Sequence, residues 1–439
     1  MFFADEDAVH VGEPAFGIRT HGFSLSTVLR VHPSIVDAGA AWRPAADKVG
    51  GVSEPGRVPP DLTLHNWQTA PHLHWAFQHL ADFLPTARIS RGDGPVAELP
   101  PRAVALSDIP LPGAASVGEV MDATATDGWI VTRHGEVLEE RYPSGMLPDT
   151  PHLLMSVSKT LIATVAGALV GQGALVPDTP VTNYVPALAN SGYAGATVRH
   201  LLDMRSGIGF SEEYLDPLAE VRLLEQAIGW APRTVPDLPD TMYGFLLTLR
   251  QAGPHGGPFD YRSCETDVLG WVCEAAAGER MPALMSELLW SRIGAQTDAV
   301  IGVDREGTGM FDGGINACLR DLVRVGTLFV TDGVSLTGRE VVEPSWIADT
   351  LAGGADSRAA FAAGRDTARF PGGMYRNKCW LPYPGDDVVL CLGIHGQMIY
   401  VNRPAGMVAA KLSSWALPEE NDKLMATIAA FDAIAAELR

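Results

Sequence analysis

Two polar residues three positions apart, Ser156 and Lys159, stand at the head of an apolar stretch and have the types needed for a nucleophile and its base. Residues with this spacing share one face of a helix, so we expect the hydroxyl and the amine to lie side by side. Serine becomes a strong nucleophile only when a neighbouring group accepts its proton. Lys159 can accept it only as a neutral amine, so we expect burial and the positive end of the helix dipole to lower its pKa. The Ser156 N–H at the same helix start can stabilise an oxyanion.

The stretch from Ser156 to Gly171 has the spacing of a buried helix. Gly171 and Gly173 mark its end, and its apolar positions are Leu161, Ile162, Val165, Ala166, Leu169 and Val170. A Ser-x-x-Lys motif also arises by chance, and on an exposed face it is only a solvated pair. The rest of the chain must therefore decide what the motif means.

A third group is needed to carry the proton to a leaving amine or alcohol. Tyr261 is the candidate, because it lies in a loop just before a helix expected from about Thr266 to Ala277. A cationic Lys159 nearby would lower the pKa of this phenol. The alternative is a tyrosine that only packs over the start of that helix.

Composition limits the class of protein. The 439 residues are 46% hydrophobic, which is enough for two packed lobes. The formal net charge of −20 argues against nucleic acid or an anionic membrane as partner. An acidic surface suits cationic substrates, although solubility or salt tolerance explains it equally well. We expect a small-molecule substrate and leave open a homodimer.

The chain carries no sign of export or membrane insertion. Its amino terminus lacks the basic and apolar regions of a secretory signal. The longest apolar run, Leu161 to Val170, is about half a membrane span. The five cysteines form no Cys-x-x-Cys pair, which indicates reduced, buried thiols. These features together predict a cytoplasmic protein.

Strand patterns at both ends and helical patterns between them indicate an α/β (α+β) fold. Residues 1–110, rich in Pro and Gly, are interpreted as an extended segment that wraps the α/β lobe, with one helical island near Trp75. Residues 111–180 and 300–439 are expected to form that lobe, and residues 181–299 a helical lobe. The expected elements of the α/β lobe are a hairpin at 128–142, strands within 388–413 and helices at 317–329 and 421–438. The helical lobe is expected to have helices at 198–204, 218–228, 242–250, 266–277 and 281–293.

Several motifs together resemble a known family. Ser156-x-x-Lys159, Leu201-Leu-Asp-Met-Arg-Ser-Gly-Ile208 and Tyr261-Arg-Ser263 occur in the order and spacing of the serine β-lactamase and penicillin-binding protein superfamily. More closely, the chain resembles the 6-aminohexanoate-dimer (nylon oligomer) hydrolases and their carboxylesterase relatives. The blocks that carry this likeness, from about Trp67 to the C-terminus, are Trp67-Gln-x-x-Pro-His72, Trp75-Ala-Phe77, His152–Lys159, Thr266–Trp271, Gly393–Gln397 and Lys411–Trp415. The resemblance implies an antiparallel sheet flanked by helices, with the active site between this lobe and a helical lobe.

The resemblance also implies roles. Ser156 would be the nucleophile, Lys159 its base and Tyr261 the second acid/base. The oxyanion would lie between the backbone N–H groups of Ser156 and Ile394.

Further residues would bind substrate. Tyr214 matches a substrate-contacting tyrosine on a mobile lid, here residues 207–230. Glu225 and Glu419 fall where the oligomer hydrolases carry acidic residues near the substrate ammonium, and both are Glu where Asp is expected. The extra methylene moves the charge by about 1.5 Å, which puts nylon-oligomer cleavage in question.

The chain departs from the penicillin-recognising members at one strand. Those members use Lys-Thr-Gly to hold a carboxylate, whereas this chain has Cys391-Leu-Gly-Ile-His-Gly396. A strong β-lactamase or transpeptidase is therefore not expected. His395 either donates to substrate or satisfies the end of the strand.

Other chemistries find less support. There is no Gly-x-Ser-x-Gly nucleophile elbow and no glycine-rich phosphate loop, and His72-Leu-His74 has no partner at metal spacing. We therefore expect a serine hydrolase without cofactor or metal, which cleaves linear amides (6-aminohexanoate oligomer-like) and short-chain carboxylic esters through an acyl-enzyme. The alternatives are a carboxylesterase without nylon-oligomer activity, a β-lactamase or D-aminopeptidase-like hydrolase, and an inactive binding protein on the same fold.

Overall fold

A seven-stranded antiparallel sheet forms the centre of the protein. The computed structural model describes residues 58–111, 116–385 and 387–439, which belong to one compact unit, Pro44–Arg439. The strand order is β3-β2-β11-β10-β9-β8-β7. The strands are β2 (Thr126–Arg133), β3 (Glu136–Arg141), β7 (Met374–Arg376), β8 (Cys379–Leu381), β9 (Val388–Gly393), β10 (Gln397–Asn402) and β11 (Met407–Ser413). The expected hairpin at 128–142 and the antiparallel strands within 388–413 are confirmed.

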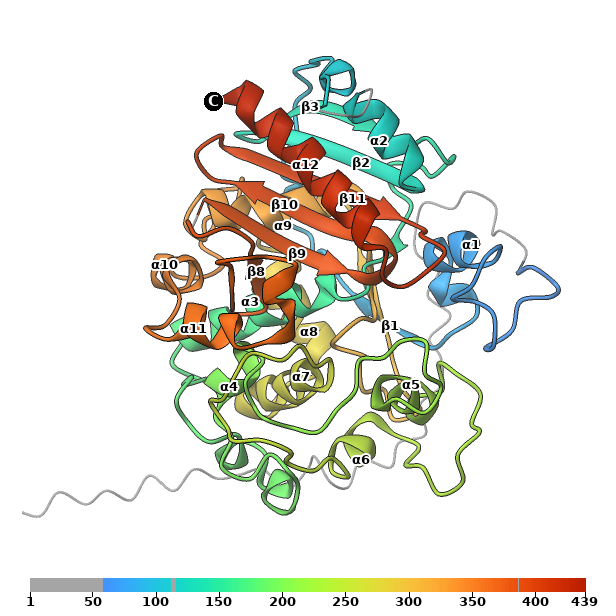
Figure 1. The fold of residues 1–439 in the computed structure, drawn as a ribbon, viewed down its shortest axis with the longest axis vertical. Helices are drawn as coiled ribbons and strands as arrows, with labels where there is room; N and C mark the ends of the chain where they lie inside the picture. Colours follow the sequence, from blue (N-terminus) through green and yellow to red (C-terminus); the bar gives the residue numbers. More distant parts are fainter. Residues whose placement is uncertain (1–57, 112–115, 386) are drawn as a thin grey trace, which may run out of the picture. The chain divides into compact units, whose positions relative to one another are not determined.

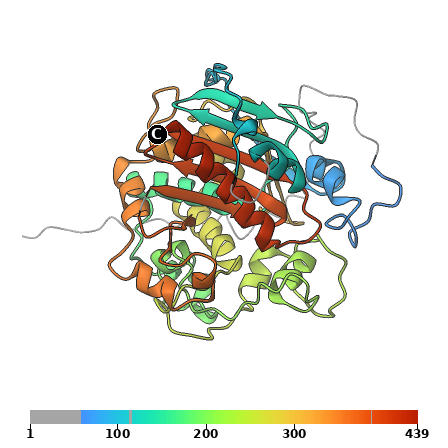
Figure 2. The ribbon, with the colours of Figure 1, turned by 45° about the horizontal axis from the view of Figure 1, so that its top comes forward.

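Helices cover both faces of this sheet (Figure 1). The C-terminal helix α12 (Asn421–Leu438) lies across one face with α2 (Val117–Ala123) beside it. Helices α9 (Leu319–Val330) and α3 (Val157–Gly171) pack on the opposite face, as the turned view in Figure 2 also shows. The expected antiparallel sheet flanked by helices is therefore confirmed.

A second, smaller antiparallel sheet has the order β1-β5-β6-β4. Its strands are β1 (Thr86–Ile89), β4 (His152–Leu153), β5 (Ala299–Gly302) and β6 (Ile315–Ala317). Strand β1 and the preceding helix α1 (Leu73–Gln78) come from the segment interpreted as extended, so this segment contributes a strand that its sequence pattern did not indicate. Residues 1–57 and 112–115 of the expected segments lie outside the described residues.

The middle of the chain is helical, as expected. Its helices are α4 (Val198–Leu202), α5 (Glu220–Ala227), α6 (Met242–Leu246), α7 (Cys264–Ala277) and α8 (Met281–Met285). The helix expected over 281–293 changes after Met285 into a π-helical turn, Ser286–Trp290. Two more helices fall between α9 and β7, where the sequence indicated no element: α10 (Pro344–Ala352) and α11 (Ser357–Ala362). Short 3-10 turns occur at Leu80–Asp82, Leu106–Asp108, Val181–Asn183, Pro186–Asn190, Arg365–Ala368 and Ile394–Gly396.

Helix α3 is buried on every side, not on one face. Its apolar positions are covered, and so are the polar side chains of Ser158, Lys159, Thr160 and Thr164. Hydrogen bonds satisfy these polar groups: the Thr160 hydroxyl, for example, donates to the Lys378 carbonyl oxygen over 2.8 Å. A helix buried all round needs such partners, because an unpaired polar group in the core is costly. The helix that begins at the candidate nucleophile is thus a rigid core element.

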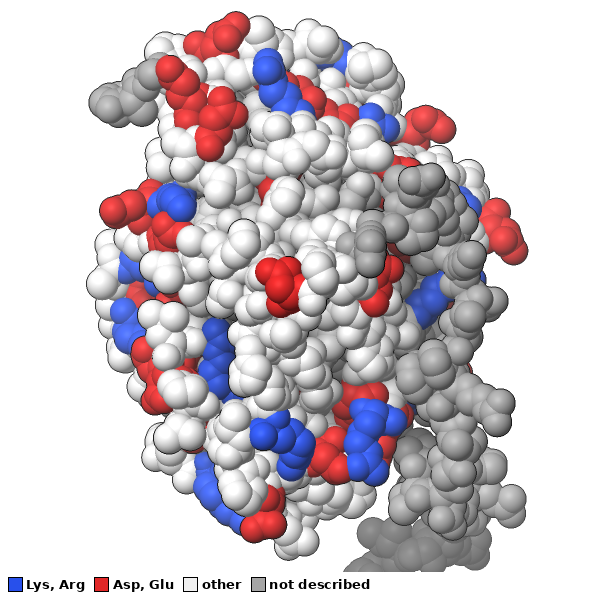
Figure 3. All heavy atoms as spheres, turned by 90° about the vertical axis from the view of Figure 1, so that its right-hand side faces the viewer, with Lys and Arg blue, Asp and Glu red and all other residues white. Residues whose placement is uncertain are grey.

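The cysteines and the charged surface residues agree with what the composition indicated. All five cysteines are buried and none is in a disulfide. Within the described ranges, no helix is both long and apolar enough to cross a bilayer. On the face drawn in Figure 3, Lys and Arg stand among Asp and Glu and form no continuous basic patch.

Candidate active site

Ser156 and Lys159 are in direct contact at the start of α3. Lys159 Nζ donates to Ser156 Oγ over 2.7 Å, to Ser263 Oγ over 3.0 Å and to the Asp312 carbonyl oxygen over 2.9 Å. The Asp312 carboxylate lies 3.4 Å from the same nitrogen. Three hydrogen bonds use every N–H of an ammonium group. The Lys159 side chain is therefore held in one place with its tip against the candidate nucleophile.

Helix α7 positions the two other partners of Lys159. Ser263 directly precedes its first residue. Within its first turn, the buried Asp267 accepts hydrogen bonds from the backbone N–H groups of Phe311 and Asp312, each over 3.1 Å. These bonds hold the turn that presents the Asp312 carbonyl oxygen to Lys159. The contact between α3 and α7 thus builds the floor of the site.

The protonation state of Lys159 differs from the sequence-based expectation. Burial alone would lower its pKa, but interactions with Tyr261, Asp312 and Glu212 outweigh burial and raise the pKa above its usual value. The prediction of a lowered pKa is therefore wrong. The acidic groups that surround the amine are distant in sequence, so the Ser-x-x-Lys motif alone could not show them. Lys159 rests as an ammonium ion.

Tyr261 lies in the same cavity as Ser156. Its ring centroid is 5.2 Å from Lys159 Nζ, and the ring stacks on Trp380 at a centroid distance of 5.5 Å. Burial raises the pKa of this phenol, although the charge of Lys159 opposes the shift. The expected net lowering by the lysine is thus wrong as well. Tyr261 rests as a neutral phenol between the aromatic wall and the ammonium.

The end of strand β9 approaches Ser156 very closely. A Cβ atom added to Gly393 would lie 2.6 Å from the Leu154 carbonyl oxygen and 3.1 Å from the Ser156 backbone nitrogen. Only glycine fits this contact. The next residue, Ile394, therefore begins its turn beside the start of α3. This arrangement places the two backbone segments expected to form the oxyanion hole next to each other.

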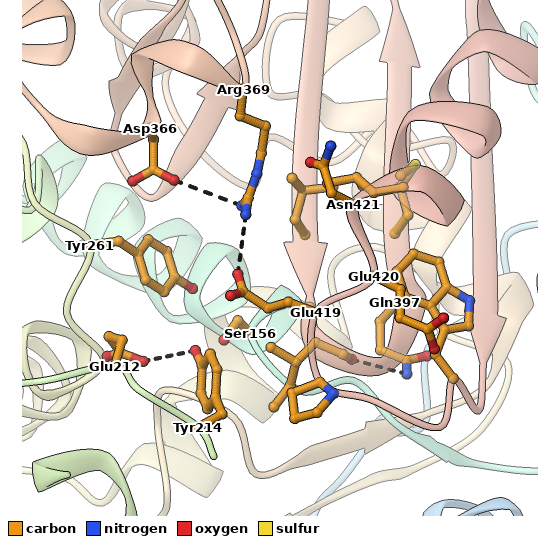
Figure 4. Close-up of a pocket in the computed structure, with 18 of the residues that line it drawn as sticks. Ser156, Glu212, Tyr214, Tyr261, Asp366, Arg369, Gln397, Glu419, Glu420 and Asn421 are labelled. Carbon is orange, nitrogen blue, oxygen red and sulfur yellow. Dashed lines mark hydrogen bonds and ion pairs between the residues drawn. The ribbon is translucent and has the colours of Figure 1, made fainter. Parts of the chain in front are cut away.

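Ser156 opens into a cavity of about 320 Å³ (Figure 4). Tyr261, Tyr214 and Glu419 also line it, so the structure brings four of the residues singled out from the sequence into one cavity, together with Ile394. Glu419 lies at the rim with its carboxylate 3.3 Å from Arg369, which also faces Asp366 at 3.7 Å. Figure 4 shows Glu419 and Arg369 above Ser156, with Asp366 beyond Arg369, and Glu212 to the left of Ser156.

Glu212 joins Tyr214 to the catalytic candidates. Its buried carboxylate accepts from the Tyr214 hydroxyl over 2.7 Å, from the Ser263 hydroxyl over 3.2 Å and from the Ser263 backbone N–H. Since Ser263 also accepts from Lys159, a continuous hydrogen-bonded chain runs from Tyr214 to Ser156. No local pattern in the sequence indicated this role of Glu212. Asp312, equally important to Lys159, carried no sequence signal.

Glu225 and His395 do not line the cavity that contains Ser156. Glu225 accepts from Arg222 over 2.8 Å and from Gln68 over 2.9 Å, and it lines a second cavity. His395 is buried, and its Nδ1 donates to the Trp415 carbonyl oxygen over 2.7 Å. Burial lowers its pKa to about 4. His395 was expected either to donate to substrate or to satisfy the end of the strand. Its hydrogen bond to Trp415 is the second of these arrangements.

The two histidines with a ligand-like spacing have protein partners instead. His72 Nε2 lies 3.4 Å from Asp61, and His74 Nδ1 lies 2.8 Å from the buried Asp127. Among the residues that the structure places, no three His, Cys, Asp or Glu side chains gather in a way that would hold a metal ion.

Comparison with known proteins identifies the family. A family model described as Beta-lactamase matches residues 114–433. The chain belongs to this family. It is 42% identical over 370 residues to the 6-aminohexanoate-dimer hydrolase of Paenarthrobacter ureafaciens, a match that covers 83% of this chain and 91% of that protein. It is 30% identical over 190 residues to Esterase EstB of Burkholderia gladioli, which covers 40% of this chain and 47% of that protein.

Solved structures show the same fold. A Bacillus anthracis protein described as a candidate 6-aminohexanoate-dimer hydrolase has a TM-score of 0.79 at 24% identity, covering 88% of this chain and 99% of that one. A family VIII carboxylesterase has a TM-score of 0.54 at 16% identity, covering 72% and 96%. The resemblance seen in the motifs is confirmed, and this Beta-lactamase family member is a hydrolase.

Proposed function

We propose that this hydrolase cleaves linear amides and short-chain carboxylic esters through an acyl-enzyme on Ser156. One observation carries the proposal: the buried Lys159 amine lies 2.7 Å from a hydroxyl that opens into a cavity of about 320 Å³. A nucleophile in hydrogen-bond contact with its base is the geometry that covalent catalysis requires. Tyr261 in the same cavity supplies the second acid/base.

The protonation states of Lys159 and Tyr261 before substrate binds determine the first step of catalysis. With an ammonium at Lys159 and a phenol at Tyr261, the pair must first lose one proton before it can act as a base. The neutral Lys159 amine then takes the Ser156 proton while Oγ forms a bond to the substrate carbonyl carbon. The negative charge that develops on the carbonyl oxygen is stabilised by the N–H groups of Ser156 and Ile394.

Collapse of this intermediate breaks the bond to the leaving group. Tyr261 gives its proton to the departing nitrogen or oxygen and recovers one from the Lys159 ammonium. Water then attacks the acyl-enzyme and gives its proton to the same pair, and Ser156 Oγ leaves with a proton. The sum is one water added across one amide or ester bond.

Substrate class follows from the cavity and the relatives. The 6-aminohexanoate-dimer hydrolase and esterase relatives support linear amides and esters as the two bond types. Tyr214 and Glu419 line the cavity and are the proposed substrate contacts, whereas Glu225 and His395 lie outside it. Tyr214 belongs to the proposed lid, residues 207–230, and its bond to Glu212 would link lid closure to the position of Lys159.

Replacing Ser156 with alanine tests the proposal. Loss of a serine nucleophile costs up to about a millionfold in turnover, so hydrolysis of p-nitrophenyl acetate should fall to the background rate. A variant that retains a tenth of wild-type activity would refute the role of Ser156. Assaying the 6-aminohexanoate dimer beside the ester separates a hydrolase of both bond types from a carboxylesterase without oligomer activity.

A further inference from the structure

A second cavity of about 360 Å³ adjoins the one that contains Ser156. Tyr214 and Pro418 line both cavities, so these two side chains form the wall between them. The second cavity collects segments that are far apart in the sequence: residues 64–69, 214–226, 231–234 and 416–418. A substrate chain that passes Tyr214 would enter it directly.

The second cavity has an apolar rim. Leu215, Leu417 and Leu64 line it and are 75%, 50% and 37% exposed, which is unusual for large apolar side chains that are close together. The buried Trp67 adds an aromatic surface. Such a lining gains free energy when an alkyl chain covers it. The chemistry of the rim therefore suits a hydrocarbon segment.

The charged groups of this cavity neutralise each other. Among the described residues that line it, Arg222 and Glu225 are the only Arg, Lys, Asp or Glu residues. Arg222 Nη1 lies 2.9 Å from Glu225 Oε1 and 2.8 Å from Oε2, and Gln68 Nε2 donates to Oε1 over 2.9 Å. An incoming ammonium would have to displace the guanidinium, and it would meet that positive charge at short range.

Arg222 also fixes the wall between the cavities. Its Nε donates to the Tyr214 carbonyl oxygen over 2.7 Å, and its guanidinium carbon lies 5.9 Å from the centre of the Tyr214 ring. Arg222 thus neutralises Glu225 in the second cavity and also holds Tyr214 in place between the two cavities.

We propose that the second cavity binds the uncharged far end of the substrate's acyl chain, and that Arg222 selects against a free ammonium there. This inference rests on the proposed function. The acyl side is assigned because Tyr261, the proton donor to the leaving group, lines the first cavity alone and stacks on Trp380. The leaving group therefore occupies the part of the first cavity near Tyr261 and Trp380. The acyl chain extends toward Tyr214 and Pro418, which border the second cavity. The preferred substrate is an N-capped or longer ω-amino acid derivative, or an alkanoyl ester.

A matched pair of esters tests this selectivity. Ethyl 6-acetamidohexanoate and ethyl 6-aminohexanoate differ only in the charge at the far end of the acyl chain, and the released acids are measured by chromatography. We expect kcat/KM to be at least tenfold higher for the acetamido ester. In Arg222→Met, which releases the Glu225 carboxylate, this ratio should fall at least tenfold. Because the ratio is taken within one variant, a general loss of activity cancels.

Filling the second cavity gives an independent readout. Ala416 lines it and is exposed, so Ala416→Trp should lower kcat/KM for ethyl 6-acetamidohexanoate at least tenfold and leave p-nitrophenyl acetate unchanged. Ala189 is exposed and lines neither cavity, so Ala189→Trp is the matched control and should change neither rate.

The outcomes separate this inference from the proposed function. A wild-type preference for the amino ester, or an Ala416→Trp effect that is equal on long and short esters, would overturn the inference while Ser156-dependent hydrolysis stands. If neither p-nitrophenyl acetate nor any longer ester is hydrolysed, the proposed function fails and the inference fails with it.

Discussion

Replacing Gly393 with alanine probes the close approach of strand β9 to the nucleophile. The new Cβ would lie 2.6 Å from the Leu154 carbonyl oxygen and 3.1 Å from the Ser156 nitrogen, both backbone atoms. Cβ atoms essentially never lie within 3.0 Å of another heavy atom, so the two segments must separate by about 0.4 Å, the difference between 3.0 and 2.6 Å. The Ile394 N–H follows Gly393 directly and moves with the strand. Loss of one oxyanion donor costs about 100- to 1000-fold, and a misplacement of 1 Å about 100-fold. Scaled to a shift of about 0.4 Å, the cost is about sixfold, so we expect kcat to fall about 5- to 10-fold.

The assay is initial-rate hydrolysis of p-nitrophenyl acetate, with circular dichroism to show that the variant is folded. KM should change less than kcat, because the carbonyl oxygen gains its charge only in the transition state. Gly94→Ala is the control, since the nearest atom to its added Cβ is the Ser291 carbonyl oxygen at 3.8 Å. If folded Gly393→Ala keeps more than a third of the wild-type kcat, the reasoning about this contact is wrong.

Three further predictions concern protonation. Since the pKa values of Lys159 and Tyr261 are both raised, the basic form of the pair is scarce at neutral pH, and kcat/KM should rise about tenfold per unit from pH 6 to 8; a flat profile would contradict this. Glu212→Gln removes a charge that raises the Lys159 pKa, so the rise in kcat/KM should move to lower pH, as a pH–rate profile will show; an unmoved profile would contradict this. Burial raises the pKa of Glu265 to about 7 from 4.5, so the folded state holds a proton that the unfolded chain releases, and stability falls as pH rises between these values. From pH 5.5 to 7.5 the wild type should lose about 2 kcal/mol more unfolding free energy in urea than Glu265→Gln, and equal losses would exclude this effect.

The sequence predicted the parts of the site that depend on local spacing. Ser156 and Lys159 meet because residues three positions apart on a helix share a face. The strands within 388–413 followed from continuous apolar runs with a turn between them. The sequence also indicated α7, which was expected over 266–277 and is observed over Cys264–Ala277. In each case the signal lay within one element.

The parts that the sequence missed depend on contacts between distant segments. Lys159 keeps its charge because Asp312 and Glu212 reach it from loops more than fifty residues away. Glu225 was expected near the substrate ammonium, yet Arg222 on the same helix already neutralises it. Strand β1 formed from a Pro- and Gly-rich segment because β5 offered it an edge. Local patterns contain none of this information.

Mass spectrometry of a trapped covalent adduct identifies the residue that acts as the nucleophile. The protein is incubated with a fluorophosphonate probe, its intact mass is measured, and the modified peptide is sequenced. We predict one equivalent of probe on Ser156, and none on Ser156→Ala under the same conditions. A protein that hydrolyses p-nitrophenyl acetate but carries the probe on another residue, or carries none, would contradict it.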